Sequence, residues 1–370
     1  MSLPASPAFR SNYSALDRLL HRLALNVAPV AELSFDIDQA AYGRKKPDFG
    51  VETKRHVFVS GLARAGTTVL MRRFHETGAF RSLTYRDMPF VLAPNMWKSM
   101  SAASRSPAVS GERAHDDRLQ VDVDSPESLD EVFWRIFTGD DYIRDGCLVP
   151  YMPDDEAVAR FRRYVAAILP ADRPDSRYLS KNNNNVLRLD GIRKAFPEAL
   201  ILVPFRDPVQ QAASLRAQHA RFIGLQRDDR FVRSYMTWLG HHEFGSDHRP
   251  FHLREGDRER LAAHSPDTLD YWLVNWTNVY GCLLESAPGS AVFVCYEDLC
   301  RDPAVWALLR TQAALDEDPV HMQPFELAAR EVALPRTGAI EDAARQVYAR
   351  LRERSGAVAS GRLKPDRIPA

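Results

Sequence analysis

The sequence feature that most constrains the fold is a glycine-containing loop between a short apolar segment and a helical pattern. Residues 56–60 read His-Val-Phe-Val-Ser, which is typical of a buried strand. Gly61 to Gly66 follow, and a helical pattern then continues to about Gly78, a candidate C-cap. Such a loop directs the N–H groups of its backbone and of the helix N-terminus toward one point. The segment therefore predicts an anion site in an α/β architecture.

The loop is similar to a Walker A loop in its spacing but differs from it in its charge. Four residues separate Gly61 from Gly66, but Thr67 stands where ATPases and GTPases carry a lysine. The cation of this loop is Arg64, which lies inside it. A P-loop nucleotide kinase or ATPase is therefore disfavoured, although it stays open as an alternative. A tight strand–helix turn without a ligand is the second alternative.

Strand and helix patterns alternate along the rest of the chain. The apolar run at 199–205 is typical of a strand buried on both faces of a parallel sheet. Further strands are expected at 177–180 and 291–295. Helices are expected at about 126–137, 154–169, 185–196, from 207 onward, and at 228–243, 268–287, 303–314 and 340–354. This order predicts an α/β fold, a three-layer sandwich with a mainly parallel central sheet.

The distribution of apolar and polar segments also suggests how the chain is divided. Residues 1–50 are expected to form an N-terminal helical arm, 51–355 one domain, and 356–370 a flexible tail. The polar segment 99–125 is expected to be a loop. No run of about 18 apolar residues and no signal-peptide pattern occurs. We therefore expect a soluble, cytoplasmic protein without an integral membrane segment.

Composition excludes several classes of function. Lys+Arg and Asp+Glu balance at 49 each, so net charge does not favour nucleic acid, and none is expected as a partner. The four cysteines are too few and too scattered for a disulfide framework or a zinc site. His241-His242-Glu243 lacks a third ligand at metal-like spacing, and adjacent helical residues point in different directions. No metal site is predicted.

A second candidate anion site follows the apolar run at 199–205. Arg206 stands at its carboxyl end, and Ser214 comes eight residues later in a helix opened by Asp207-Pro208. Ligands of parallel sheets bind outside the carboxyl ends of the strands. An arginine fork and a serine hydroxyl there are suited to one shared phosphate. Taken alone, Arg206 has a capping or ion-pair role as its alternative.

Together the two segments resemble sulfotransferases that use 3′-phosphoadenosine 5′-phosphosulfate (PAPS), closest to the bacterial and tyrosylprotein-type branches with their P-loop-like fold. The resemblance covers roughly residues 55–350, and Tyr296-Glu297-Asp298-Leu299 is a further family-like signature. It implies that Arg206 and Ser214 hold the 3′-phosphate. It also implies that the 5′-phosphosulfate is held by Arg64, Ala65, Gly66, Thr67 and Thr68. The glycine-rich C-terminal segment of the cytosolic enzymes is absent, and Arg336 is its candidate substitute.

The resemblance also implies catalytic residues. Lys181, in Ser180-Lys181-Asn182-Asn183, looks like the lysine that accompanies the transferring sulfuryl group in related branches, with asparagines where the family often has proline. Arg64 is expected to share this cationic role, and a surface lysine is the alternative for Lys181. Asp87 lies 21 residues after Gly66, in the region that carries the base of the tyrosylprotein branch. A cap or a salt bridge to Arg86 is the alternative for Asp87. The other candidate bases are His75, His115, Asp130 and Glu131.

The sequence thus predicts a PAPS-dependent sulfotransferase that moves a sulfuryl group to an acceptor hydroxyl, without a metal, and releases adenosine 3′,5′-bisphosphate. A glycan, a lipid, a peptide and a small molecule all stay open as acceptors. The adenine contacts and the oligomeric state also stay open. Besides the kinase or ATPase, a catalytically inactive nucleotide-binding protein of the same fold is the remaining alternative.

Overall fold

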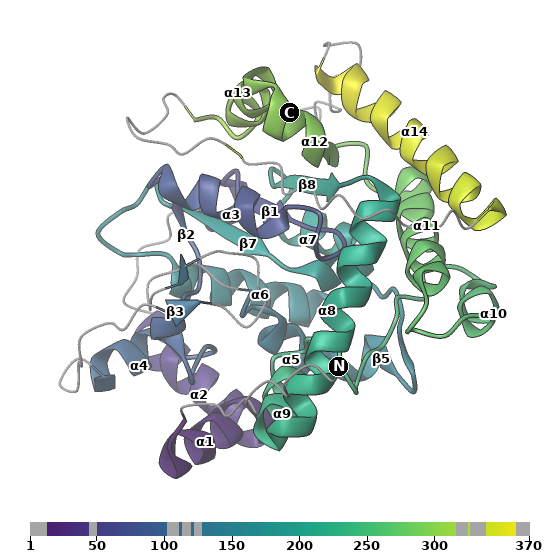
Figure 1. Cartoon of the computed structure of the whole chain (residues 1–370). Helices are drawn as coiled ribbons and strands as arrows, with labels where there is room; N and C mark the ends of the chain where they lie inside the picture. The colour runs from purple at the N-terminus through teal and green to yellow at the C-terminus, as the bar shows by residue number, and fades with distance from the viewer. Residues whose placement is uncertain are drawn as a thin grey trace.

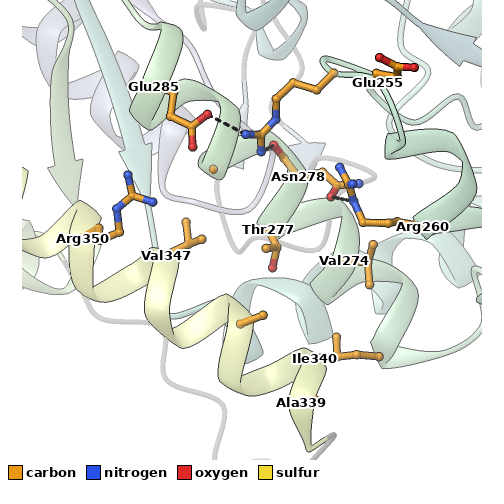
Figure 2. A pocket seen from close by; sticks show the side chains of 13 residues that line it. Glu255, Arg260, Val274, Thr277, Asn278, Glu285, Ala339, Ile340, Val347 and Arg350 are labelled. Carbon is orange, nitrogen blue, oxygen red and sulfur yellow. Dashed lines mark hydrogen bonds and ion pairs between the residues drawn. The ribbon is translucent and has the colours of Figure 1, made fainter.

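A five-stranded parallel sheet forms the centre of the computed structural model, which describes residues 13–43, 50–101, 111–112, 120–121, 128–315, 325 and 338–359 (Figure 1). All neighbouring strands of this sheet run parallel. The prediction of a mainly parallel central sheet is therefore confirmed. The strands follow the order β2 (Phe80–Arg81), β7 (Arg177–Lys181), β1 (Val57–Val59), β8 (Leu200–Phe205) and β9 (Val292–Cys295).

Helices bury both faces of this sheet, so the molecule has three layers. Side chains alternate between the faces of a strand, and Val57 and Val59 point to one apolar cluster while Phe58 points to another. The first cluster is completed by α3 (Thr67–Glu76), α12 (Tyr296–Arg301) and α13 (Pro303–Gln312). The second is completed by α5 (Glu131–Tyr142), α6 (Asp155–Ile168), α7 (Leu189–Ala195), α8 (Pro208–Asp228), α11 (Leu269–Ser286) and α14 (Ala339–Ala359).

The strand order of the sheet reverses between the neighbouring strands β1 and β8, because the chain continues to opposite sides of the sheet after these two strands. After β1 the chain crosses to β2 on one side, and after β8 it crosses to β9 on the other. Crevices at such a switch point, outside the carboxyl ends of the strands, are where open α/β sheets bind ligands. The loop after β1 and the segment after β8 carry the two predicted anion sites, so the topology brings them to one edge.

The N-terminal arm contributes to the larger core. It consists of α1 (Ala15–His21), a π-helix (Arg22–Asn26) and α2 (Ala28–Ala41), and Pro29 lies in the first turn of α2, where proline is tolerated. The ring of Phe35 on α2 lies 5.2 Å from that of Phe137 and 6.3 Å from that of Phe133, both on α5. These rings pack α2 against α5.

Several elements differ from the expectation. The helix expected from 126 begins at Glu131, and residues 125–127 lie outside the described residues. The helix expected at 228–243 is shorter, because Gly240 has a φ of +74° that ends helical geometry after α9 (Arg230–Trp238). Within the expected loop 99–125, α4 (Pro94–Ser101) ends and β3 (Gly111–Glu112) pairs with β4 (Gln120–Val121). Helix α14 continues to Ala359, beyond the expected end at 354.

The helix expected at 185–196 is divided into a 3-10 helix, η6 (Asn183–Leu187), and α7. Short elements that the sequence did not predict fill other connections. They are η3 (Val51–Thr53), η4 (Tyr85–Asp87), β5 (Ile143–Arg144), β6 (Cys147–Leu148) and α10 (Asp257–Ala262). Their few residues carry too weak a periodicity to be recognised. None of the helices among the described residues is both long enough and apolar enough to span a bilayer.

A buried ion pair joins helix α5 to Arg188, the residue directly before helix α7. Arg188 donates to both oxygens of Glu131 at 2.9 and 3.0 Å, and the side chains are 0% and 1% exposed. The Arg188 guanidinium lies 4.9 Å from the ring centroids of both Trp134 and Tyr142. Asn182 donates to Glu131 at 2.7 Å, and it directly follows the predicted catalytic Lys181. The pair therefore anchors the chain at the carboxyl edge of the sheet.

Removal of one partner of this pair should destabilise the protein strongly. Arg188→Met leaves the Glu131 carboxylate buried without its counter-charge, which should lower the free energy of unfolding by about 3–5 kcal/mol. Urea unfolding of both proteins measures the difference. The matched control is Arg160→Met, which removes the exposed pair of Arg160 with Glu156 and should cost at most about 0.5 kcal/mol. Equal losses in the two variants would contradict a special role for the buried pair.

Candidate active site

The loop after β1 has a backbone that only glycine fits at two positions. Gly61 has a φ of +148°, and a Cβ atom there would lie 3.1 Å from the carbonyl oxygen of Pro204 on β8. Gly66 has a φ of +81°, and a Cβ atom there would lie 2.3 Å from Cδ2 of Tyr296. The two glycines therefore let the loop pass close to β8 and to the start of α12.

Buried polar side chains hold this loop from α8 and α11. Gln211 on α8 donates from Nε2 to the carbonyl oxygen of Ala63 at 2.9 Å, and it accepts at Oε1 from the indole N–H of Trp276 at 2.9 Å. The hydroxyl of Tyr280 donates to the carbonyl oxygen of Pro204 at 2.7 Å. Local sequence patterns do not single out these residues as supports of the loop. Their spacing along the chain is that of ordinary core positions, and only the fold brings them into contact with the loop and with β8.

The N-terminus of α3 suits an anion. Gly66 is the N-cap in the left-handed region, and no side chain in the described structure caps this helix end. By contrast, Asp207 caps α8 by accepting from the N–H of Gln210 at 3.0 Å. An uncapped helix N-terminus presents several N–H donors and the positive end of the helix dipole. The loop and the first turn of α3, with Thr67 buried and Thr68 half-buried, thus offer donors to one anionic group.

One hydrogen bond joins the two candidate anion sites. Arg64 in the loop donates from Nε to the Oγ atom of Ser214 on α8 at 3.0 Å. The two residues are 150 positions apart in the sequence. The structure therefore brings together the two segments that the sequence assigned to the two ends of one ligand.

Arg206 lies at the carboxyl end of β8, next to the signature segment 296–299. Its Nε atom lies 4.0 Å from Oε1 of Glu297, and its guanidinium lies 5.3 Å from the ring centroid of Tyr296. The Glu297 oxygen also accepts from the backbone N–H of Asp207 at 2.9 Å. Because the Tyr296 ring packs against Gly66 as well, this tyrosine contacts both candidate anion sites.

Lys181 belongs to a polar cluster at the end of β7, where it pairs in register with Val59 on β1. The Glu243 carboxyl accepts from Nδ2 of Asn183 at 2.7 Å, and its other oxygen lies 3.5 Å from Nδ1 of His241. Burial opposes ionisation of Glu243, but the charges of His241 and Lys181 and the hydrogen bonds from His241 and Asn183 outweigh it. Together they hold the pKa of Glu243 well below its usual range. Among the described residues, no group of His, Cys, Asp or Glu has a metal-binding arrangement.

Asp87 is engaged in local contacts. Its carboxylate accepts from the N–H of Thr84 at 2.7 Å and from the Thr84 hydroxyl at 3.1 Å, forming a capping box for η4. Both of its oxygens also accept from Arg81, at 3.1 and 3.0 Å. The ion-pair partner is therefore Arg81 and not Arg86. The role of Asp87 as a base stays a prediction.

The remaining candidate bases lie in different surroundings. Asp130 accepts from the hydroxyls of Ser180 at 2.5 Å and Tyr178 at 3.1 Å. Burial raises the pKa of Asp130, and these hydrogen bonds counter it only in part. Its neighbour Glu131 forms the buried ion pair with Arg188, and the Asp130 and Glu131 carboxylates both lie in the core. His75 is half-buried in the last turn of α3. His115 and Arg336 lie outside the described residues.

Part of this chain matches a known protein family. Residues 56–219 match the model of the sulfotransferase family. They contain the loop, Lys181, Arg206 and Ser214. The sulfotransferase resemblance predicted from the sequence is therefore confirmed over these residues, and the family supports sulfuryl transfer in general. No curated protein sequence matches the chain.

Three solved bacterial structures are similar to the chain. Sulfotransferase STF1 from Mycobacterium tuberculosis H37Rv is 14% identical, with 94% of this chain and 85% of that chain covered and a TM-score of 0.41. Sulfotransferase STF9 from Mycobacterium avium is 17% identical, with 99% and 88% covered and a TM-score of 0.45. A sulfotransferase from Alicyclobacillus acidocaldarius is 14% identical, with 83% and 96% covered and a TM-score of 0.37.

The packing of Tyr296 on Gly66 predicts a difference between two glycine variants. Gly66 and Gly78 both have positive φ, +81° and +73°, but nothing lies within 4 Å of a Cβ atom at Gly78. Gly78→Ala should therefore cost only the left-handed backbone penalty of about 1–2 kcal/mol. Gly66→Ala should cost about 1–3 kcal/mol more, because the Tyr296 ring must move. Urea unfolding compares the two, and equal destabilisation would show that the ring contact is not what requires a glycine.

Proposed function

We propose that this chain, whose residues 56–219 match the model of the sulfotransferase family, transfers a sulfuryl group from PAPS to an acceptor hydroxyl. The observation that carries the proposal is the hydrogen bond from Arg64 to Ser214. It joins a helix N-terminus suited to one phosphate with a serine suited to a second. A ligand with two separate phosphate groups is what such a pair of sites fits best.

The residues around these sites fit the donor. The uncapped N-terminus of α3 and the Arg64 guanidinium would hold the 5′-phosphosulfate, with Gly66 allowing a close approach of the backbone. Arg206 and Ser214 would hold the 3′-phosphate. Arg206 is buried against Tyr296 and Glu297, so its guanidinium is directed by fixed neighbours. Arg336 remains a proposed late contact to the donor.

The donor supplies a sulfuryl group and departs as adenosine 3′,5′-bisphosphate. Arg64 and Lys181 would neutralise the negative charge that develops on the departing phosphate, so the proposed reaction draws its cations from side chains. Lys181 is suited to this role because it stands at the end of β7, opposite the last residue of β1, from which the loop departs. The proposed acceptor is a glycan, lipid, peptide or small molecule that carries a hydroxyl.

The first test of this proposal concerns ligand preference. Adenosine 3′,5′-bisphosphate should bind at least tenfold more tightly than ADP, a difference of about 1.4 kcal/mol, because only the bisphosphate reaches Arg206 and Ser214. Titration calorimetry with both ligands measures this ratio. Arg206→Ala and Ser214→Ala should each bring the ratio of the two affinities closer to one. The matched control is Arg216→Ala on the same helix, which should keep it. Equal affinities for the two ligands in the unaltered protein would refute the assignment of the second phosphate site.

The second test separates binding from chemistry. Arg206→Ala should mainly raise the KM for PAPS, because its phosphate is remote from the reacting sulfur and is bound equally in ground and transition states. Lys181→Ala should instead lower kcat by about 10²–10³, with donor affinity nearly unchanged. Transfer from radiolabelled PAPS to phenol or to a cell extract gives kcat and KM, and calorimetry gives donor affinity. A Lys181→Ala enzyme with normal kcat would remove Lys181 from the mechanism.

A further inference from the structure

The turn after α9 presents two polar side chains at the end of β7. Gly240 has a φ of +74°, and a Cβ atom there would lie 2.5 Å from Cγ of the buried Glu131. Asn184, in the turn after β7, donates from Nδ2 to the carbonyl oxygen of Gly240 at 3.0 Å. The turn is therefore fixed against the buried ion pair. His241 and Glu243 follow it directly.

The same segment continues onto helix α8. The N–H of Gly245 donates to Nδ1 of His219 at 3.2 Å, and the N–H of Ser246 donates to Oε1 of Gln226 at 2.6 Å. His219 lies five residues after Ser214, which is about 7.5 Å along the helix axis. Residues 240–246 therefore connect the strand end that carries Lys181 with the helix that carries Ser214. Glu243 lies within range of the charge of Lys181, which is the residue of this strand end that the resemblance assigns to the reaction.

The two side chains are arranged as an oriented pair. Asn183 occupies one oxygen of the Glu243 carboxylate at 2.7 Å, which leaves the other oxygen facing Nδ1 of His241 at 3.5 Å. Glu243 is 11% exposed and His241 26% exposed, so the carboxylate is sheltered while the imidazole reaches the surface of the cluster. When the imidazole is neutral, the charge of Lys181 and the hydrogen bond from Asn183 still favour the ionised form of this carboxylate. A carboxylate beside Nδ1 favours the tautomer in which Nε2 is able to accept a proton.

We propose that His241 is the general base for the acceptor hydroxyl and that Glu243 is its positioning residue. The inference rests on the proposed function. In this step Nε2 of His241 takes the hydroxyl proton while the acceptor oxygen forms its bond to sulfur. The bond from sulfur to the 5′-phosphate oxygen breaks, and its electron pair stays on that phosphate near Lys181. The imidazolium, stabilised by Glu243, afterwards returns its proton to solvent.

The other carboxylates of the site are less suited to this step. Asp87 uses both oxygens for Arg81 and the cap of η4, and Asp130 is buried against Ser180 and Tyr178. Glu131 holds the buried Arg188. His241 is the candidate that combines partial exposure with an orienting carboxylate, and that carboxylate lies within range of the charge of Lys181.

Two acceptors of different acidity test this role. At mildly alkaline pH para-nitrophenol is largely ionised and needs no base, whereas phenol keeps its proton. His241→Ala should lower kcat for transfer from PAPS to phenol by about 10²–10⁴, with a much smaller loss for para-nitrophenol. Glu243→Gln should give a smaller loss with the same dependence on the acceptor. Added imidazole should partly restore the phenol reaction of His241→Ala.

Control measurements separate this role from a structural one. His264→Ala, in the loop between α10 and α11, removes a histidine outside the cluster and should leave both reactions unchanged. Calorimetry with adenosine 3′,5′-bisphosphate should give the same affinity for the unaltered protein, His241→Ala and Glu243→Gln. If His241→Ala keeps its kcat for phenol, or loses both reactions equally, the assignment is wrong even though the enzyme is a sulfotransferase.

A readout without turnover tests the pair directly. Nitrogen chemical shifts of the His241 ring should show the proton on Nδ1 in the unaltered protein, and Glu243→Gln should reduce the population of that tautomer. A ring that carries its proton on Nε2 and does not respond to Glu243→Gln overturns the inference. If the unaltered protein binds no adenosine 3′,5′-bisphosphate and transfers sulfuryl to neither phenol nor para-nitrophenol, the proposed function fails. The tautomer of His241 then still decides whether Glu243 orients its ring.

Discussion

The contact on which the rest of the site depends is the buried ion pair of Glu131 and Arg188. Desolvation of two charges offsets most of their attraction, so such a pair adds little net stability compared with an apolar core. Its value here lies in what surrounds it. Asn182 donates to Glu131 next to Lys181, and Gly240 lies against Glu131 next to His241. The pair therefore sets the position of the segment after β7 and of the turn at Gly240. These two segments contact each other through Asn183 and Glu243.

The two candidate anion sites rely on a different kind of constraint, the close approach of backbone to side chain. Gly66 makes room for the Tyr296 ring, and the same ring lies beside Arg206. Gln211 donates a hydrogen bond to the carbonyl oxygen of Ala63 and thereby fixes the position of the loop. Rigid supports of this kind matter for an anion site, because N–H groups and guanidinium forks bind well only when they point to one place before the ligand arrives.

The sequence predicted the parts of the molecule that local patterns determine. The parallel sheet, the loop at 61–66 and the cap at Asp207 all follow from residues that are neighbours in the chain. The resemblance assigned Arg64 and Ser214 to two ends of one ligand, but their direct hydrogen bond across 150 residues was not predicted. The contact of Asn183 with Glu243 spans 60 residues, and no spacing rule encodes it. Asp87 was selected by its distance from Gly66, and that distance does not show that Arg81 and Thr84 occupy its oxygens.

The pairing of β8 with β9 has a consequence for how this chain can be divided. The family match ends at 219, but β9, the Trp276 that holds Gln211 and the Tyr296 that packs on Gly66 all come later. The boundary of the recognised family segment is therefore not a boundary of the folded unit. A fragment that stopped there would expose the backbone edge of β8, whose side chains are buried along the whole strand. Exposed strand edges of this kind pair with strands of other molecules, so a fragment cut at this point would aggregate and would not form a smaller folded unit.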